Sequence, residues 1–432
     1  MTQKNSQSSR RSFLKSTAAA SAAVAGASSL SALRAAGAVH GGVKEEVKVG
    51  LVGCGGRGTG AAAQALGAHK ENVLWATGDA FPDRMQSSLQ GLEENGFGDR
   101  AKVPQDRQFS GLDCIDKVLD SGVDAVILAT PPGFRPMQIE KAVAKGVHVF
   151  AEKPIASDAD GVRRVMAACE EARKKNLSIV SGLCYRYEDG RRELMNHLHD
   201  GDIGQILAIQ GDYITGELWS FDRKAEMTEM EWQLRNWLYY TWLSGDMIAE
   251  QHIHTLDVMA WIKKDEYPVK AVSLGGRQVR TAPKFGNVYD HFATVYEWAD
   301  GTRGYSNCRQ QNNCWRNVNE YVLGTEGSCR VFQKEITGKK SWKYEGKARD
   351  MYQAEHDEMF AALRAGQRID NGDYMCKSTL MAIMGRMAAY TGKQVTWEEA
   401  LNSKEILVPK DVRLDAVPPE VVVAVPGITK FV

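Results

Sequence analysis

The sequence has no excess of charge of either sign and, after its first forty residues, no long hydrophobic run. Its 432 residues include 54 Lys and Arg and 54 Asp and Glu. This balance argues against a nucleic-acid surface and against a polybasic membrane contact. No segment after residue 40 is apolar for long enough to span a bilayer. We therefore expect a soluble mature chain with no nucleic-acid partner.

Closely spaced cysteines are also lacking. The eight cysteines contain no C-x-x-C pair and no cluster with the spacing of metal ligands, and Cys308 and Cys314 are the only near pair. We expect no metal site, and we expect most of the cysteines to be free, buried thiols.

The first forty residues differ in composition from the rest. Arg10 and Arg11 precede a weakly apolar, Ala- and Ser-rich run over residues 16–33, and Ala36-Gly37-Ala38 offers small residues for cleavage. Paired arginines, a mild hydrophobic region and an A-x-A site are the parts of a twin-arginine export signal. The alternative is a disordered Ala-rich tail. We predict that residues 1–38 are a signal peptide and that the mature protein is periplasmic.

A glycine-rich turn follows the first apolar run of the mature chain. Residues 47–52 read as a buried strand, glycines follow at 53, 55 and 58, and residues 59–68 read as a helix. Gly53 allows the tight turn, Gly55 has no Cβ to hold a pyrophosphate away, and Gly58 lets the helix pack close to the strand. The spacing predicts a dinucleotide-binding loop.

An acidic residue ends the second predicted strand. Residues 72–77 are apolar and lead to Asp79, where a carboxylate can accept hydrogen bonds from the adenosine ribose. The alternative for Asp79 is a helix cap. Asp79 would repel a 2′-phosphate, so NAD is favoured over NADP, although Arg84 lies nearby. The predicted contacts of this loop with NAD are Gly53, Gly55, Gly56, Arg57, Gly58 and Asp79.

Strand and helix patterns alternate as far as about residue 183. This alternation predicts a doubly wound parallel sheet of the Rossmann type over residues 47–183. From residue 184 the pattern changes to β-like segments without long helices between them, which predicts an α+β domain with a mainly antiparallel open sheet over residues 184–408. Helical patterns recur there at 245–261, 352–365 and 374–390. Residues 409–432 read as an extended arm over a neighbouring surface.

Several short motifs resemble one protein family. Ala129-Thr130-Pro131-Pro132, Glu152-Lys153-Pro154 and the segment from Gly245 to Asp257 are similar to those of the Gfo/Idh/MocA family, which includes glucose-fructose oxidoreductase and inositol dehydrogenase. The likeness extends from residue 47 to about residue 390. It implies an NAD(P)-dependent oxidoreductase acting on a sugar or polyol hydroxyl. It also places Thr130, Pro131, Glu152 and Lys153 at the cofactor.

Polar residues recur along the predicted helix at 245–261. Asp246, Glu250, His254 and Asp257 fall on one helical face. Such groups need partners, which a substrate rich in hydroxyls would supply; the alternative is a satisfied buried network. Metal binding is disfavoured, because ligands in one straight row cannot easily surround an ion.

The chemistry of alcohol oxidation suits two of these residues. Removing the hydroxyl proton needs a base, which His254 can be near neutral pH, and Lys153 can hold the hydroxyl oxygen. The resemblance implies the same roles, with Glu250 as the acid before the histidine. The family commonly has Asp and Gly where this chain has Glu250 and His252, so we expect a reshaped sugar pocket.

Aromatic and basic residues complete the predicted substrate site. Tyr185 and Arg186 open the second domain, and Arg186 could bind an acidic sugar or pair with Glu188. Trp242 belongs to an aromatic run that could form a pocket wall, the core or a subunit contact. The predicted substrate-binding set is Tyr185, Arg186, Asp246, His252, Asp257 and Trp242.

Three functions remain open from the sequence. The first is an oxidoreductase that moves hydride between a sugar or polyol and a tightly bound nicotinamide. The second is an NAD-dependent glycoside hydrolase or lyase that oxidises its sugar transiently. The third is a non-catalytic sugar- or nucleotide-binding protein. The resemblance also implies a homo-oligomer, a dimer or tetramer, that pairs through the open face of the second sheet.

Overall fold

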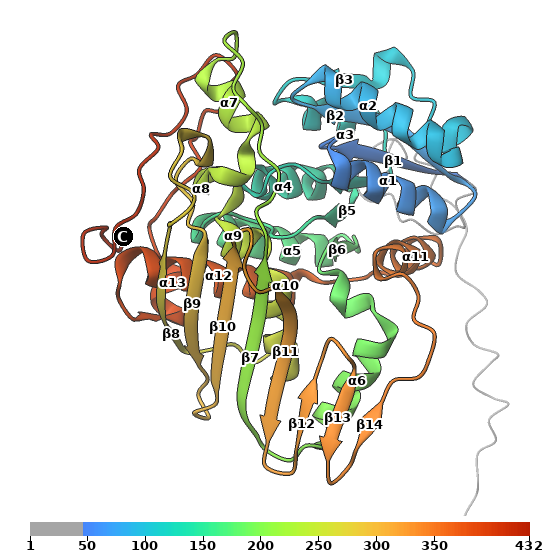
Figure 1. Cartoon of the computed structure of the whole chain (residues 1–432). Coiled ribbons are helices and arrows are strands. Elements are labelled where there is room, and N and C mark those ends of the chain that lie inside the picture. The colour runs from blue at the N-terminus through green and yellow to red at the C-terminus, as the bar shows by residue number, and fades with distance from the viewer. Residues whose placement is uncertain (1–45) are drawn as a thin grey trace, which may run out of the picture. The chain divides into compact units, whose positions relative to one another are not determined.

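The structure is a computed structural model that describes residues 46–432, and its strands form two sheets (Figure 1). The predicted signal peptide, residues 1–38, lies outside the described residues. Within them, no helix is long and apolar enough to cross a membrane. The eight cysteines are all free and all but Cys314 are buried, as expected.

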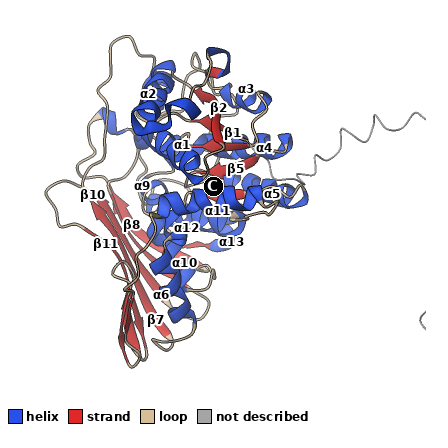
Figure 2. Ribbon diagram, turned by 90° about the vertical axis from the view of Figure 1, so that its right-hand side faces the viewer, coloured by secondary structure: helices blue, strands red, loops and turns tan. Residues whose placement is uncertain are grey.

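The first sheet has six parallel strands in the order β3-β2-β1-β4-β5-β6. Helices cover both of its faces (Figure 2), which confirms the doubly wound sheet. The order reverses between β1 and β4, and in such sheets a ligand binds outside the carboxyl ends of the strands at that point. The strands are β1 (Val47–Val52), β2 (Asn72–Asp79), β3 (Gln108–Ser110), β4 (Ala125–Leu128), β5 (His148–Ala151) and β6 (Ile179–Ser181), and the helices are α1 (Gly56–Ala68), α2 (Pro82–Leu92), α3 (Cys114–Asp120), α4 (Arg135–Lys145) and α5 (Ala159–Lys174).

The second sheet has nine strands in the order β14-β13-β12-β11-β7-β10-β9-β8-β15. Every pairing is antiparallel except that of β7 with β10, so the sheet is mainly antiparallel as predicted. Its strands are β7 (Ile206–Thr215), β8 (Lys270–Gly276), β9 (His291–Glu297), β10 (Arg303–Gln310), β11 (Asn317–Gly324), β12 (Gly327–Arg330), β13 (Glu335–Gly338), β14 (Trp342–Lys343) and β15 (Val395–Thr396).

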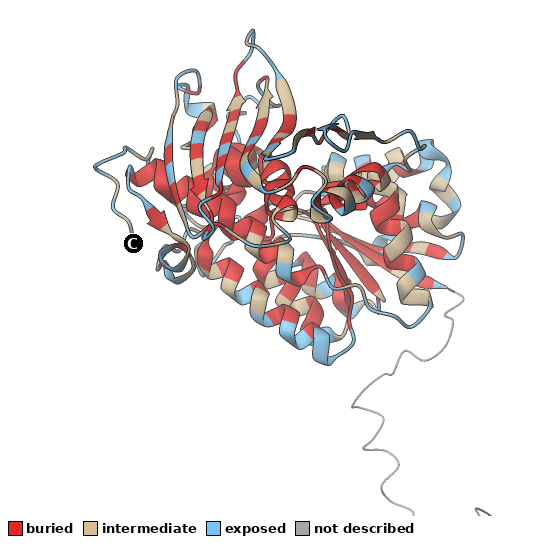
Figure 3. Cartoon of the chain, turned by 90° about the horizontal axis from the view of Figure 1, so that it is seen from below, coloured by how far each residue is buried: buried red, intermediate tan, exposed pale blue. Residues whose placement is uncertain are grey.

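Helices lie on one side of this second sheet only (Figure 2). Buried and exposed residues alternate along its strands (Figure 3), which is the pattern of a sheet with one packed face. The helices of this part are α6 (Asp189–His199), α7 (Glu229–Arg235), α8 (Thr241–Ser244), α9 (Met247–Glu250), α10 (Ile253–Ile262), α11 (Met351–Arg364), α12 (Gly372–Thr391) and α13 (Trp397–Asn402). Shorter helical turns lie at Glu93–Phe97, Gly98–Arg100, Gln105–Arg107, Pro132–Phe134, Cys184–Tyr187, Trp237–Tyr239 and Pro283–Phe285.

Two late helices join the two sheets. α12 is buried along nearly its whole length and packs against α5 of the first sheet and against β8 and α10 of the second. α11 packs on α1, directly behind the glycine loop. One hydrophobic cluster therefore contains residues from both parts, such as Val126 of β4 and Met384 of α12.

The prediction of one continuous helix over residues 245–261 is wrong. The structure has α9 and α10 in its place, with Asp246 at φ 72° capping α9 and Gln251 and His252 between the two helices. The break lies at Gln251 and His252, whose backbone N–H groups both donate to the carbonyl of Met247, each at 3.0 Å, so the regular helical ladder is interrupted there. The regular spacing of the polar residues therefore does not place them on one helical face.

The chain after residue 408 has no helix or strand and lies against its own chain. The hydroxyl of Tyr289 donates to the carbonyl of Ala424 at 2.9 Å, and the Ser403 hydroxyl donates to the carbonyl of Val432 at 2.7 Å. Val423 and Phe431 pack on the large hydrophobic cluster. The extended arm thus covers a surface of the same molecule.

Candidate active site

The glycine loop between β1 and α1 has room for a ligand on one side only. Gly53 has φ +94°, and a Cβ on Gly58 would lie 1.9 Å from the carbonyl oxygen of Gly53, so both positions require glycine. A Cβ on Gly55 or Gly56 would meet no atom within 4 Å among the described residues. Gly55 is the N-cap of α1 and offers no side-chain acceptor to the first N–H groups of the helix. An open, uncapped helix N-terminus fits a pyrophosphate.

Asp79 lies at the carboxyl end of β2 and links the glycine loop to the start of α2. Its Oδ2 accepts the backbone N–H of Cys54 at 2.7 Å, and its Oδ1 accepts that of Phe81 at 2.9 Å. Burial raises the pKa of this carboxyl. Asp79 is not the cap of α2, whose N-cap is Phe81. It is held where an adenosine ribose would reach it.

The guanidinium of Arg57 has several partners within the protein. It forms an ion pair with Glu152, donates to Gln64 at 3.1 Å and lies 3.5 Å from a carboxylate oxygen of Glu355 on α11. Arg57 also fixes Glu152, the residue before Lys153.

Arg135 fixes the segment after β4 through hydrogen bonds to backbone carbonyls. This buried guanidinium donates to the carbonyl of Thr130 at 2.6 Å and to that of Pro154. The hydroxyl of Thr130 donates to Gln138 at 2.7 Å. Thr130 and Pro131 thus stand at the carboxyl end of β4, beside the Glu152-Lys153-Pro154 turn after β5.

Lys153, Glu250 and His254 are brought together although α9 and α10 are separate helices. The ammonium of Lys153 donates to the backbone carbonyl of Glu250 and lies 3.2 Å from its carboxylate, and the two side chains are 14% and 15% exposed. His254 is 8% exposed, and its ring centre lies 5.0 Å from that of Tyr185.

His254 is held in its neutral form. Burial lowers the pKa of His254 well below its ordinary value, and the positive charges of Lys153, Arg191 and Arg57 lower it further. A neutral imidazole can accept a proton, so His254 is suited to be a base and Lys153 to stabilise an oxyanion.

Arg191 and Glu320 belong to the surroundings of this site and were missed by sequence reasoning. Arg191, on α6, is buried, and its guanidinium lies 3.7 Å from the centre of the Tyr185 ring. It also forms an ion pair with Glu188 at 2.7 Å. Glu320 of β11 is buried 3.7 Å from Arg191 and accepts a hydrogen bond from Thr255. In the sequence, Arg191 and Glu188 look like an ordinary surface pair on a helix, and nothing marks Glu320.

Three predicted substrate-binding residues are instead used inside the protein. Asp257 accepts two hydrogen bonds from Arg186, at 2.8 and 2.9 Å, and one from Ser378 at 2.7 Å. Arg186 also pairs with Asp265 at 2.6 Å, so the predicted pairing with Glu188 is not observed.

Asp246 is buried as well and accepts the N–H of Tyr289 and the hydroxyl of Tyr390. The contacts of Asp246, Arg186 and Asp257 are those of a satisfied buried network, the alternative that the sequence left open.

His252 and Trp242 also lie in the core. His252 is fully buried, its Nε2 is 2.6 Å from the Ser306 hydroxyl of β10, and burial lowers its pKa to about 3. The indole of Trp242 donates to Gln233 at 2.8 Å and contacts Phe134 edge to face. The expectation that His252 adds a ring to the substrate pocket is not met, because the ring turns toward the second sheet.

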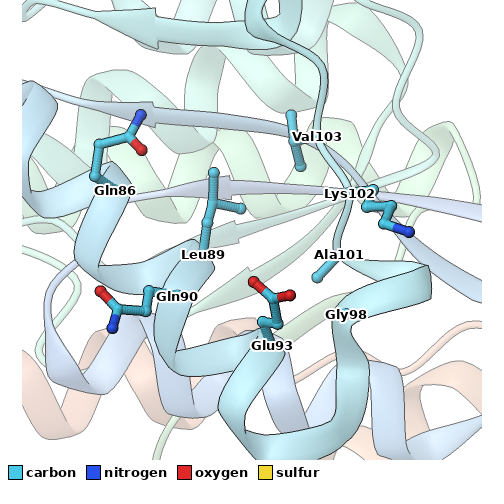
Figure 4. A pocket seen from close by; sticks show the side chains of 8 residues that line it. All are labelled: Gln86, Leu89, Gln90, Glu93, Gly98, Ala101, Lys102 and Val103. Atoms are coloured by element: carbon cyan, nitrogen blue, oxygen red, sulfur yellow. The ribbon is translucent and has the colours of Figure 1, made fainter.

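A hollow of about 330 Å³ lies between α2 and the chain that follows it (Figure 4). Its walls include Leu89, Glu93 and Lys102, and none of the predicted site residues line it. It lies outside the cleft formed by the carboxyl ends of the strands, and we assign it no role in the chemistry.

The chain is similar to curated proteins that act on sugars and polyols. It is 26% identical over 246 residues to the 2,7-anhydro-N-acetylneuraminate hydratase of Escherichia coli, covering 57% of this chain and 60% of that protein. It is 24% identical over 292 residues to an inositol 2-dehydrogenase of Rubrobacter xylanophilus, covering 67% and 72%. It is 28% identical over 256 residues to a glycosyl hydrolase family 109 protein of Shewanella, covering 55% and 52%. The chain thus spans less than two thirds of the first and third of these relatives.

Solved structures share the fold. An oxidoreductase from Thermotoga maritima superposes with a TM-score of 0.64 at 19% identity, covering 82% of this chain and all of that one. Levoglucosan dehydrogenase, solved with NADH and levoglucosan, superposes with a TM-score of 0.61 at 16% identity, covering 81% and 99%.

Two family models match consecutive parts of the sequence and together cover more than half of it. Residues 47–180 match the oxidoreductase family with an NAD-binding Rossmann fold, and residues 192–330 match the C-terminal domain of the same family. These matches agree with the open glycine loop, with Asp79 at the end of β2 and with the mixed second sheet. The chain therefore belongs to the Gfo/Idh/MocA family, and its first sheet forms an NAD-binding Rossmann domain.

Proposed function

We propose that this protein is an NAD-dependent dehydrogenase of a secondary hydroxyl on a sugar or polyol. The observation that carries the proposal is the convergence of Lys153, Glu250 and a neutral His254 beside the NAD-binding loop. The inositol dehydrogenase among the relatives supports the same substrate class.

Each of the three residues has a defined task in this reaction. The ammonium of Lys153 holds the substrate oxygen and favours its alkoxide form, while Glu250 fixes the position of that ammonium. His254 accepts the hydroxyl proton, because its surroundings keep the imidazole uncharged. NAD, when bound along the glycine loop, supplies the hydride acceptor.

The test is the formation of NADH with inositols, aldoses and their acids, followed by the rise of NADH absorbance. Lys153→Ala should lower kcat/KM by about 10²-fold to 10⁴-fold without loss of bound nucleotide. The matched control is Lys145→Ala on α4, which removes an exposed lysine paired with Asp120 and should leave the rate unchanged. Equal rates for wild type and Lys153→Ala would refute the site assignment.

Glycoside cleavage through transient oxidation is the second candidate. It is supported by the names of two relatives, a hydratase and a glycosyl hydrolase, neither of which describes a net oxidation. Lys153 and His254 would serve the same first step. Release of an aglycone from a nitrophenyl glycoside with no net NADH would favour this activity, whereas stoichiometric NADH and a keto-sugar would favour the dehydrogenase. The presence of Lys153 and His254 argues against a purely binding function.

We also propose export by the twin-arginine route and function in the periplasm. Support comes from the paired Arg10 and Arg11 and the A-x-A sequence at 36–38. Cell fractionation of the full chain should find the protein in the periplasm, and replacing both arginines by lysine should retain it in the cytoplasm. Equal export of the Lys-Lys variant would exclude this route.

A homo-oligomer that pairs through the outer face of the second sheet is the remaining proposal. Val272 and Leu274 of β8 and Tyr305 of β10, two strands separated by β9, are exposed, and Leu274 is 78% exposed. Apolar side chains gathered on an uncovered sheet are typical of subunit contacts. Sedimentation of wild type and Leu274→Lys should show a dimer or tetramer that the substitution dissociates.

A further inference from the structure

A segment of the second domain reaches across to the first domain beside the adenosine end of the NAD site. It consists of residues 217–235, which run from the end of β7 to the end of α7, and we call it the latch segment. It contacts residues 81–84, which directly follow Asp79 and open α2. In Figure 1, α7 stands above the second sheet at the level of α2.

Three contacts fasten the latch segment to residues 81–84. Arg235 donates two hydrogen bonds to Asp83, each 3.1 Å long, and its guanidinium lies 3.9 Å from the centre of the Phe81 ring. In the opposite direction, the guanidinium of Arg84 lies 5.3 Å from the centre of the Phe221 ring. Each side therefore supplies one arginine and one aromatic ring.

The fastened loop is the loop that positions Asp79. The backbone N–H of Phe81 donates to the Asp79 carboxylate, which also accepts the N–H of Cys54 in the glycine loop. A nucleotide whose ribose is bound at Asp79 would thus lie between the glycine loop and the chain that the latch segment holds. Opening the latch would free residues 81–84 to move away from the nucleotide.

The latch segment is anchored by buried residues of α7, whereas its contacts with residues 81–84 are partly exposed. Trp232 of α7 is buried in a hydrophobic cluster, and the backbone N–H of Phe221 donates to Asn236, the residue that caps the end of α7. Phe221 is 40% exposed, and in the Arg235–Asp83 pair the two side chains are 19% and 60% exposed. Exposed ion pairs and cation–π contacts each contribute only about 1 kcal/mol or less, so such a fastening can open without unfolding its base.

We propose that residues 217–235 are a latch that closes over the adenosine end of bound NAD and slows its release, with the Arg235–Asp83 pair as its fastener. The proposal rests on NAD binding by the glycine loop and does not depend on which substrate the enzyme takes. It makes Arg235 and Asp83 positioning residues that touch neither the nicotinamide nor the substrate site. An enzyme with this latch retains its nucleotide between turnovers.

The test is the rate of NADH release without any substrate. Protein loaded with NADH is mixed with excess NAD⁺ in a stopped-flow instrument, and the loss of NADH fluorescence gives the release rate. Arg235→Gln and Asp83→Asn should each raise this rate by roughly threefold to tenfold, and the double variant should raise it no further. The exchanged pair Asp83→Arg with Arg235→Asp should restore slow release.

The matched control is Arg223→Gln, which removes an ion pair with Glu229 that lies wholly within the latch segment. It should leave NADH release at the wild-type rate. Hydrogen exchange of residues 217–235 should slow when NAD is added, and less so in Arg235→Gln. Unchanged release in folded Arg235→Gln and Asp83→Asn proteins, or an equal effect of Arg223→Gln, would overturn the latch. Because no substrate is present, this result is independent of the dehydrogenase assay.

Discussion

At the scale of single residues, the site is defined by what surrounds one histidine. His254 lies in an apolar environment with Lys153, Arg191 and Arg57 close enough to oppose its protonation. The three cations come from the turn after β5, from α6 and from α1, so their joint effect requires the folded domains. The sequence predicted Lys153 and His254 as the reacting pair, but not the two arginines that keep the imidazole neutral.

The pH dependence of the reaction should show this environment. The imidazole must be unprotonated to act as a base, so activity falls as the pH drops through the pKa of His254. Because that pKa is lowered in the fold, the acid limb of kcat/KM should lie below pH 6.5, the ordinary value for histidine. The profile of kcat/KM against pH gives the pKa of the acid limb. An NMR titration, with the His254 signal assigned from His254→Asn, tests whether His254 is the group that titrates there. A limb above pH 6.5 that follows His254 would contradict the assignment.

At the scale of elements, the NAD loop depends on contacts between backbone atoms. Gly58 must approach Gly53 so closely that a methyl group has no space. The sequence predicted this requirement correctly from spacing alone, since both glycines belong to one strand–turn–helix unit. By contrast, the regular spacing at 246, 250, 254 and 257 predicted one helix where the structure has two.

Alanine substitutions within α1 distinguish a glycine whose position has no room for a Cβ from one whose position has room. Gly58→Ala should abolish measurable NAD binding and lower the Tm, because the new methyl would lie 1.9 Å from the Gly53 carbonyl oxygen. Gly60→Ala meets only Arg57 Nη1, at 3.7 Å, and should bind NAD normally with stability raised by about 0.5–1 kcal/mol. Calorimetric titration with NAD and thermal unfolding test both variants, and normal binding by Gly58→Ala would refute the packing argument.

The Arg186–Asp257 pair should prove structural. Asp257→Asn removes one partner of a buried ion pair, which costs about 3–5 kcal/mol of unfolding free energy. Asp265→Asn removes the partly exposed second partner of Arg186 and should cost no more than about 1 kcal/mol. Urea unfolding of the two variants gives the comparison. A fully stable Asp257→Asn protein with a raised KM would instead return Asp257 to the substrate site.

At the scale of the whole molecule, the two sheets share α11 and α12, which come late in the chain. α11 places Glu355 against Arg57 of the glycine loop, and α12 places Ser378 against Asp257. The NAD loop and the substrate-side helices are therefore braced by the same C-terminal elements. The latch segment adds a further link, at the opposite end of the NAD site.

The purified protein should carry its cofactor. A nucleotide held between the glycine loop and a closed latch is expected to survive purification, so denaturing the protein should release close to one NAD(H) per chain. Chromatography of the supernatant, with detection by the absorbance of adenine, measures the amount of NAD(H) released. An empty protein that binds added NAD rapidly would show that the nucleotide exchanges freely and that the latch does not retain it.

The sequence by itself determined the features that depend on neighbouring residues: the alternating strands and helices, the glycine turn, Asp79 at the end of β2, and the change to a second kind of sheet. Those patterns arise from hydrophobic period and backbone sterics, which act over a few residues. The tertiary structure alone decided which polar residues pair with one another inside the fold. Arg186 and Asp257 pair across 71 positions and Arg57 and Glu355 across 298, and Arg235 meets Asp83 across 152. No local pattern records such partners, because burial and charge pairing between distant segments exist only once the chain has folded.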